Sequence, residues 1–156
     1  MNKGALIYKD YIKIIEDKIV FINNLNLNQI QPSSLDLTLS EECYEIKSSF
    51  LSPNNRVREK LFNMTINKID ITKTKIFKKN KTYIARLNEK LELNSNIQGL
   101  CNPKSSTGRL DIFCRTILDY SDEYEKIPLN YSGEIFLEIT PRSFDIEFNQ
   151  GDSLNQ

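Results

Sequence analysis

The segment GEIFLEIT, residues 133–140, carries the clearest strand pattern in the chain. Ile135, Leu137 and Ile139 alternate with other residues, as expected where one face of a strand packs on a core. Glu138 is a lone carboxylate that falls on the opposite face. The pattern allows two interpretations of Glu138, either an exposed strand residue or a group that transfers protons.

Short strand-like segments recur on both sides of this stretch, at a spacing of roughly ten residues. Leu6 to Asp17 has helical spacing and predicts one short helix near the N-terminus. Nothing alternates strands with long helices, so the sequence predicts a mostly β barrel or sandwich. The predicted strands cover residues 19–22, 32–39, 66–71, 82–87, 91–93, 112–114 and 144–148.

Composition limits the classes of function. The chain has 156 residues, a length typical of one domain, with 21 basic and 21 acidic side chains. Balanced charge argues against binding nucleic acid or an anionic membrane surface, and the lysine cluster at 73–81 is predicted to be a solvated hairpin face. No apolar run approaches about 18 residues, and no signal peptide is evident, so a cytoplasmic location is predicted.

The reactive residue types restrict the chemistry further. Cys43, Cys101 and Cys114 are widely spaced and are predicted to be reduced and buried. The sequence contains no histidine, which excludes a zinc site with imidazole ligands and any Ser-His or Cys-His nucleophile pair. Catalysis would have to use carboxylate, hydroxyl, lysine, arginine or an added metal.

A second stretch, NPKSSTGRLD at residues 102–111, concentrates polar groups and is called the cradle below. It holds a lysine, three hydroxyls, a glycine and an arginine close together. Such a segment is suited to an anion, most often a phosphate ester. The alternative is a polar turn between two strands.

Together these stretches resemble a known family. NPKSSTGRLDIF followed by YSGEIFLEITPRSF is similar to the core of the dCTP deaminases, which share a fold with the trimeric dUTPases. PSSLDLTL at 32–39 and the final GDSLNQ fit the first half of the longer bacterial form, in which two related halves follow in one chain. The resemblance implies a dUTPase-like distorted β-barrel, of β-clip or jelly-roll-like type. It also implies one domain over residues 1–156, either the N-terminal half of a longer protein or a domain without its closing C-terminal segment.

The resemblance further implies hydrolytic deamination of dCTP to dUTP and ammonia, without zinc. Mg²⁺ would be bound through the triphosphate, and dUTP would be a product or an inhibitor. Glu138 would be the general acid and base, a role suited to a carboxylate enclosed by apolar neighbours, with Ser105 and Arg109 as the other catalytic residues. The nucleotide-binding set would comprise Lys104, Ser105, Ser106, Thr107, Gly108, Arg109, Glu138 and the backbone groups of Phe136 and Leu137, with Asp36 supporting the site.

Two positions depart from the family pattern. Lys104 stands where arginine is usual, which gives a point charge in place of a bidentate fork. The sugar-side aspartate falls on Pro128, and Asp119 could replace it only if residues 119–126 fold back.

Several alternatives stay open. The chain could be a dUTPase-like pyrophosphatase, or a non-catalytic half that builds an oligomer or binds nucleotide. Arg109 could simply form a surface ion pair with Asp111 or Glu138. Sites between subunits are implied by the resemblance, so a homotrimer or a pseudo-trimeric assembly is predicted, with weak activity from this chain alone.

Overall fold

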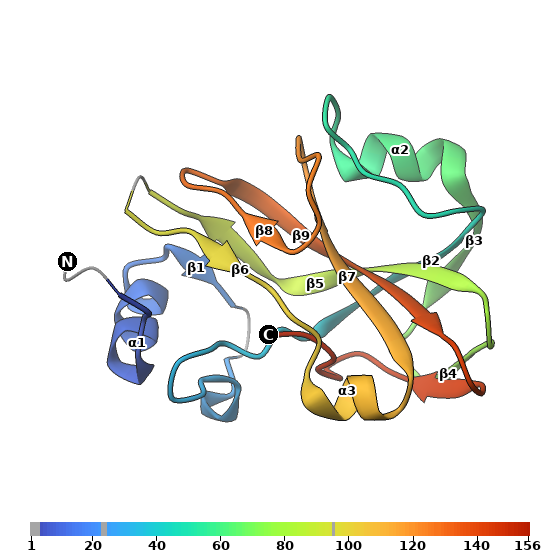
Figure 1. Cartoon of the computed structure of the whole chain (residues 1–156), viewed down its shortest axis with the longest axis horizontal. Coiled ribbons are helices and arrows are strands. Elements are labelled where there is room, and N and C mark those ends of the chain that lie inside the picture. The colour runs from blue at the N-terminus through green and yellow to red at the C-terminus, as the bar shows by residue number, and fades with distance from the viewer. Residues whose placement is uncertain (1–3, 23–24, 95) are drawn as a thin grey trace.

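The computed structural model describes residues 4–22, 25–94 and 96–156, and its centre is one antiparallel sheet of six strands (Figure 1). Two small two-stranded sheets accompany it, formed by β4 with β10 and by β6 with β8. The class is therefore mostly β, as predicted. Across the large sheet the order is β3 (Thr65–Asp70), β2 (Leu39–Ile46), β5 (Thr82–Glu92), β9 (Ser132–Pro141) and β7 (Ile112–Leu118). The sixth strand, β1 (Val20–Phe21), pairs with β5. The small sheets contain β4 (Lys75–Phe77) with β10 (Ile146–Phe148), and β6 (Gly99–Leu100) with β8 (Lys126–Ile127).

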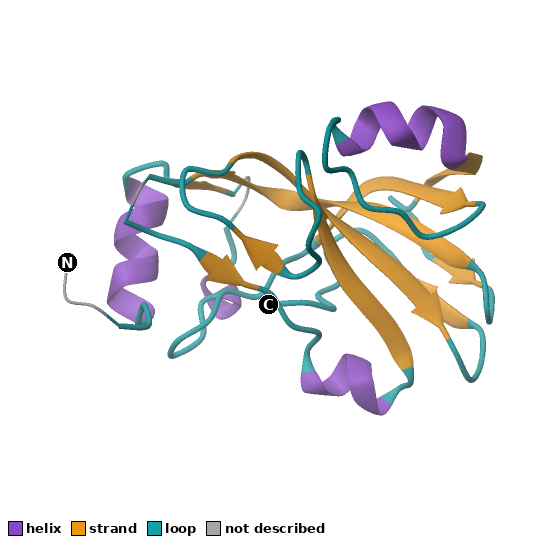
Figure 2. Cartoon of the chain, turned by 45° about the horizontal axis from the view of Figure 1, so that its top comes forward, coloured by secondary structure: helices purple, strands orange, loops and turns teal. Residues whose placement is uncertain are grey.

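Three α-helices are described, α1 (Tyr8–Glu16), α2 (Val57–Met64) and α3 (Ser105–Arg109), together with a short 3₁₀ turn, η1 (Leu27–Gln29). In both views α1 and α2 lie at opposite ends of the molecule (Figures 1 and 2). The predicted N-terminal helix is confirmed as α1. Its first turn is held by Asp10, whose carboxylate accepts a bond from the Ile7 N–H at 3.0 Å. None of these helices is long and apolar enough to cross a membrane.

The strand β9 is buried on both faces. Ile135, Leu137 and Ile139 pack into the main core, as the alternation predicts. Phe136, on the other face, is 0% exposed and packs with Ile84 and with residues of α2 in a second, smaller apolar cluster. β9 lies between β5 and β7, and apolar residues on both of its faces show that both faces are covered, so Glu138 lies in a covered layer.

The secondary structure differs from the predictions in three places. Residues 32–38 form isolated bridges and no continuous strand, because their N–H groups bond to separate segments. Asp36 N–H donates to the Gln29 carbonyl and Leu37 N–H to the Asn155 carbonyl, at 2.8 and 2.9 Å. The irregular region 48–63 contains α2, which the sequence analysis missed. The two short strands predicted at 82–87 and 91–93 are one strand, β5, whose pairing with β9 shifts register between Arg86 and Lys90.

Candidate functional site

The cradle folds as the short helix α3, fixed in place by the end of the chain. Lys104 N–H and the Thr107 hydroxyl both donate to the Leu154 carbonyl, each at 2.9 Å. Asn102 and Gln156 exchange backbone hydrogen bonds of 2.9 and 3.0 Å. The final residues thus tie the cradle to segment 32–39, which is the other part of the family resemblance.

The predicted binding residues of the cradle do not all face solvent. Ser105, Ser106, Gly108 and Arg109 are exposed. Thr107 is buried, and its hydroxyl is already used by the Leu154 carbonyl. Four of the five residues of α3 are therefore available to a ligand, whereas Thr107 supports the helix.

Lys104 is held by Asp36. The ammonium group forms an ion pair with Asp36 Oδ2, and the two side chains are 27% and 8% exposed. Asp36 Oδ1 is buried and has no hydrogen-bond partner among the residues that the structure describes. A buried oxygen without a partner is costly, so Asp36 has acceptor capacity left for a donor that enters from outside.

Glu138 occupies a polar cluster beneath the surface. It is 1% exposed. Arg115 on the neighbouring strand β7 donates to Glu138 Oε1 from Nη2 at 2.7 Å and from Nε at 3.1 Å. Ser49 donates to Oε2. Glu138 is therefore neither an exposed strand residue nor enclosed by apolar groups alone, because an arginine and a hydroxyl hold its two oxygens.

Arg115 is itself fixed by aromatic rings. Its guanidinium lies 3.8 Å from the ring centroid of Tyr124 and 4.9 Å from that of Phe113. The Tyr124 hydroxyl lies 3.0 Å from Ser49 Oγ. The sequence analysis missed Arg115, Ser49 and Tyr124. The predicted strand ended at Cys114, one residue short of Arg115, which is the register partner of Glu138 in the observed pair.

The alternative that Arg109 forms a surface ion pair with Asp111 or Glu138 was wrong, because neither pair is present among the described residues. Glu138 pairs with Arg115, and Asp111 accepts a bond from the Ser143 hydroxyl at 2.5 Å. Arg109 is exposed at the end of α3. Its predicted place beside the reacting ring stays a prediction.

A hollow of about 810 Å³ is lined by residues of the cradle and by Arg115, whereas Glu138 and Ser49 are not among its lining residues. Its wall includes Gly108 of the cradle, and Arg115 and Phe113 of β7. No bond joins Glu138 to residues 102–111 directly among those the structure describes. The volume is in the range of pockets that hold small ligands.

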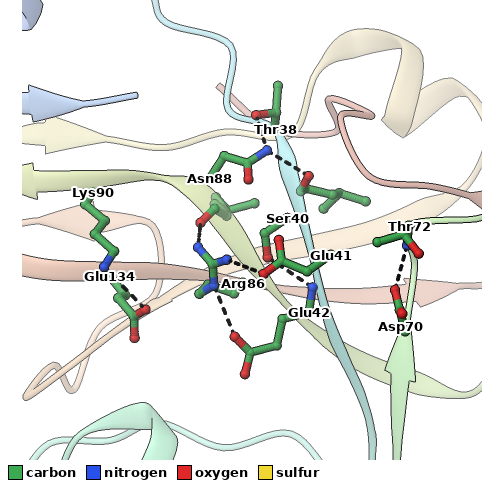
Figure 3. Close-up of polar contacts among 12 residues, drawn as sticks. Thr38, Ser40, Glu41, Glu42, Asp70, Thr72, Arg86, Asn88, Lys90 and Glu134 are labelled. Carbon is green, nitrogen blue, oxygen red and sulfur yellow. Dashed lines mark hydrogen bonds and ion pairs between the residues drawn. The ribbon is translucent and has the colours of Figure 1, made fainter. Parts of the chain in front are cut away.

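A larger hollow of about 1270 Å³ lies elsewhere and has a different character. Ion pairs centred on Arg58 line this hollow. Arg58 donates to both carboxylate oxygens of Glu42, at 2.8 and 3.0 Å, and also pairs with Glu134. Figure 3 shows Glu42, Arg86, Glu134 and Lys90, which line the same hollow. Arg58 lowers the pKa of Glu42 to about 2. Lys104 and Asp36 share this wall, but Glu138 does not.

The remaining predicted site residues have structural surroundings of their own. Phe136 and Leu137 are 0% exposed and lie in a strand that is paired on both sides. Residues 119–126 do fold back, since Glu125 N–H bonds to the Thr116 carbonyl at 3.2 Å. Asp119, however, caps α2 by accepting a 2.7 Å bond from Val57 N–H, and burial raises its pKa. A base-edge role for Phe136 and Leu137 and a sugar-side role for Asp119 stay predictions.

Two further sets of ionisable groups are buried. The three cysteines are free, as expected, and burial raises the pKa of Cys43 to about 12 and that of Cys101 to about 11. Glu89, which the sequence analysis missed, is 0% exposed and accepts bonds from Gln29 and Thr38 at 2.8–3.0 Å. Burial raises its pKa. Over the described ranges, no three histidine, cysteine or acidic residues cluster as a metal site would require.

This arrangement is a dUTPase-like β fold that carries a polar, mostly exposed short helix and a buried strand carboxylate. The family described as the 2'-deoxycytidine 5'-triphosphate deaminase (DCD) N-terminal domain matches residues 2–156. The chain therefore belongs to the dCTP deaminase family.

A solved structure supports the same assignment. The crystal structure of 2'-deoxycytidine 5'-triphosphate deaminase from Agrobacterium tumefaciens is similar over 98% of this chain, with 36% identity and a TM-score of 0.95. The similarity covers 47% of that chain, so the present chain spans about half its length. No curated protein matches the sequence.

Proposed function

We propose that this domain deaminates dCTP to dUTP and ammonia without zinc, with Glu138 as the general acid and base. The observation that carries the proposal is the hollow lined by both Gly108 and Arg115, the residue that holds Glu138. A triphosphate at the exposed end of the cradle would leave its base within this space. Family membership over almost the whole chain supports the choice of substrate.

The chemistry needs one group that accepts and returns protons. Water adds its oxygen to C4 of cytosine while Glu138 takes a proton, which it returns to ring N3. Glu138 then moves the hydroxyl proton of this adduct to the amino nitrogen, the C4–N bond breaks, and ammonia leaves as the C4 carbonyl forms. The atoms balance as dCTP plus water giving dUTP plus ammonia, and a positioned carboxylate is the ordinary means for such transfers.

The cradle supplies the other roles. Lys104 and the exposed Ser106 are proposed to contact the triphosphate, and Ser105 and Arg109 to face the reacting base. Mg²⁺ would accompany the nucleotide, because it usually binds through phosphate oxygens and water with few protein ligands.

We further propose that the active assembly is a homotrimer or a pseudo-trimer. The helix α3 is exposed, and within the described residues β7 pairs with β9 alone, so a nucleotide bound there would stay open to solvent in a single chain. Pockets usually bury most of their ligand, so a neighbouring chain or half is proposed to close the site. Light scattering measures this assembly state.

The test of the function is a product assay. The protein is incubated with dCTP or dUTP and Mg²⁺, and ammonia and pyrophosphate are measured separately. Ammonia from dCTP without pyrophosphate is the expected result. Pyrophosphate from dUTP would instead identify a dUTPase-like enzyme. If neither ammonia nor pyrophosphate is formed, catalysis by this chain is refuted.

A second candidate is a non-catalytic half that binds nucleotide or builds an assembly. Two observations favour it, namely Pro128 at the position of the family's sugar-side aspartate and the ion pair that holds Lys104 on Asp36. Binding of dCTP without product would support this candidate.

A further inference from the structure

A buried carboxylate that moves protons needs a fixed orientation, and the described contacts show what fixes this one. Arg115 places two nitrogens on Glu138 Oε1, at 2.7 and 3.1 Å. Two N–H groups on a single oxygen restrict the carboxylate more than one contact does. The Glu138 side chain is 2% exposed and that of Arg115 is 27% exposed, so Arg115 is the partner that solvent reaches.

Arg115 cannot easily turn away from this position. The guanidinium stacks 3.8 Å from the Tyr124 centroid, with Phe113 at 4.9 Å from the guanidinium carbon. Arginine combines hydrogen bonding in its plane with stacking on its faces, so both sets of contacts are made at once. Together with the bonds to Ser49 and Glu138, the contact with Tyr124 holds Arg115 from three segments outside its own strand.

The two oxygens of Glu138 differ in how firmly they are held. Oε1 accepts both hydrogen bonds from Arg115. Oε2 accepts its bond from Ser49, an exposed residue between β2 and α2. The Ser49 hydroxyl has a single proton, which it donates to Glu138 Oε2. Its oxygen therefore accepts from Arg115 Nη2 at 2.6 Å and from the Tyr124 hydroxyl at 3.0 Å. An exposed hydroxyl exchanges its partners with water more readily than a stacked guanidinium does. Oε2 is therefore the oxygen that can become free.

We infer that Arg115 is a positioning residue that fixes Glu138 through Oε1 and leaves Oε2, once Ser49 moves aside, as the oxygen that exchanges protons with water and substrate. This inference rests on the proposed deaminase function. It adds Arg115 and Ser49 to the site, neither of which the sequence motifs indicated. Arg115 lines the same hollow as Gly108 of the cradle, so it is the member of the Glu138 cluster that a ligand in this hollow would contact.

The test compares four variants of the whole chain. Arg115→Met removes both contacts to Oε1 and keeps similar bulk, and Arg115→Lys keeps the charge. Ser49→Gly frees Oε2, and Arg56→Met is the matched control, since Arg56 is an exposed arginine before α2. Circular dichroism establishes that each variant folds. The ¹³C signal of the Glu138 carboxylate, assigned by its loss in Glu138→Gln, then reports on the carboxylate without needing activity.

Arg115→Met is expected to lower kcat roughly 10²-fold with KM changed less than about threefold, because misplacing a reacting group by about 1 Å has this order of effect. Arg115→Lys should recover part of the loss, and Ser49→Gly should raise kcat severalfold. The ¹³C chemical shift of the Glu138 carboxylate should change in Arg115→Met and remain that of wild type in Arg56→Met.

The outcomes separate the inference from the function it rests on. A rise in KM with kcat intact would make Arg115 a substrate-binding residue and overturn the positioning role. An unchanged ¹³C shift of the Glu138 carboxylate in Arg115→Met would also overturn the positioning role. If Ser49→Gly lost as much kcat as Arg115→Met, the choice of Oε2 as the proton-exchanging oxygen would be wrong. A moved signal in a protein that deaminates nothing would instead refute the proposed function and leave Arg115 as the residue that orients Glu138.

Discussion

Glu42→Gln is expected to weaken the attachment of α2 to the sheet in a pH-dependent way. Glu42 on β2 accepts two bonds from Arg58 of α2 and one from Arg86 of β5 at 3.1 Å (Figure 3 shows the Arg86 contact). Glutamine has nearly the same shape, and each arginine keeps another carboxylate, Glu134 for Arg58 and Glu41 for Arg86. The substitution therefore removes one charge without leaving a cation alone.

The size of the effect follows from the pKa of Glu42, which Arg58 lowers from 4.5 to about 2. At about 1.36 kcal/mol per pKa unit, this difference of about 2.5 corresponds to roughly 3.4 kcal/mol. Arg58 is 43% exposed, although Glu42 is only 13% exposed, so solvent screening reduces the expected loss to about 1–2 kcal/mol.

The sign with pH is set by the lowered pKa. Between pH 4.5 and about 2 the unfolded chain binds more protons than the folded one, so this contribution is complete above pH 4.5 and is lost as pH falls through about 2. Urea unfolding of wild type and Glu42→Gln at pH 7, 4 and 3 measures it. Glu92→Gln, at an exposed position of β5, is the control. Equal free energies of unfolding for wild type and Glu42→Gln at pH 7 would refute the reasoning. A loss of free energy in Glu42→Gln that is as large at pH 3 as at pH 7 would refute it as well.

Three further predictions concern separate parts of the site. Lys104→Met should weaken dCTP binding about 10- to 100-fold relative to deoxycytidine, since a charge-assisted phosphate contact contributes roughly 1.5–3 kcal/mol; an unchanged ratio in calorimetric titrations would exclude a phosphate role. Asp119→Ala should destabilise the fold by about 1 kcal/mol in urea unfolding, because the Val57 N–H at the start of α2 loses its acceptor, and a neutral effect would mean that the cap contributes nothing. Chelation followed by Mg²⁺ should restore full deamination, whereas a specific need for zinc would overturn the zinc-free mechanism.

The parts of the fold that the sequence predicts well are those with local signals. Ile135, Leu137 and Ile139 form one face of β9 because alternation reports which side of a strand is buried. The short helix α1 follows from its 3.6-residue apolar spacing in the same way. Such patterns depend on neighbours along the chain, and the structure confirms them.

The parts that could not be predicted depend on distant residues. The helix α2 buries only Val57 and Leu61, and its start is capped by Asp119 from another segment, so the local pattern was weak. Segment 32–38 alternates like a strand, yet its hydrogen bonds go to η1 and to the chain end.

The candidate site divides in the same way. The cradle and Glu138 were identified from motifs, but the contacts that hold Glu138 come from Arg115 and Ser49, which lie 23 and 89 residues away in sequence. Buried polar groups find partners that no local pattern specifies.

Single-turnover deamination of dCTP by Glu138→Gln tests the central claim most directly. Glu147→Gln, an exposed glutamate of β10, serves as the control, and dCTP affinity is measured for both variants. The account predicts a loss of roughly 10²–10⁴-fold in Glu138→Gln with binding changed less than about threefold, because the general acid and base is removed while the cradle stays. Turnover near that of wild type in Glu138→Gln would contradict it.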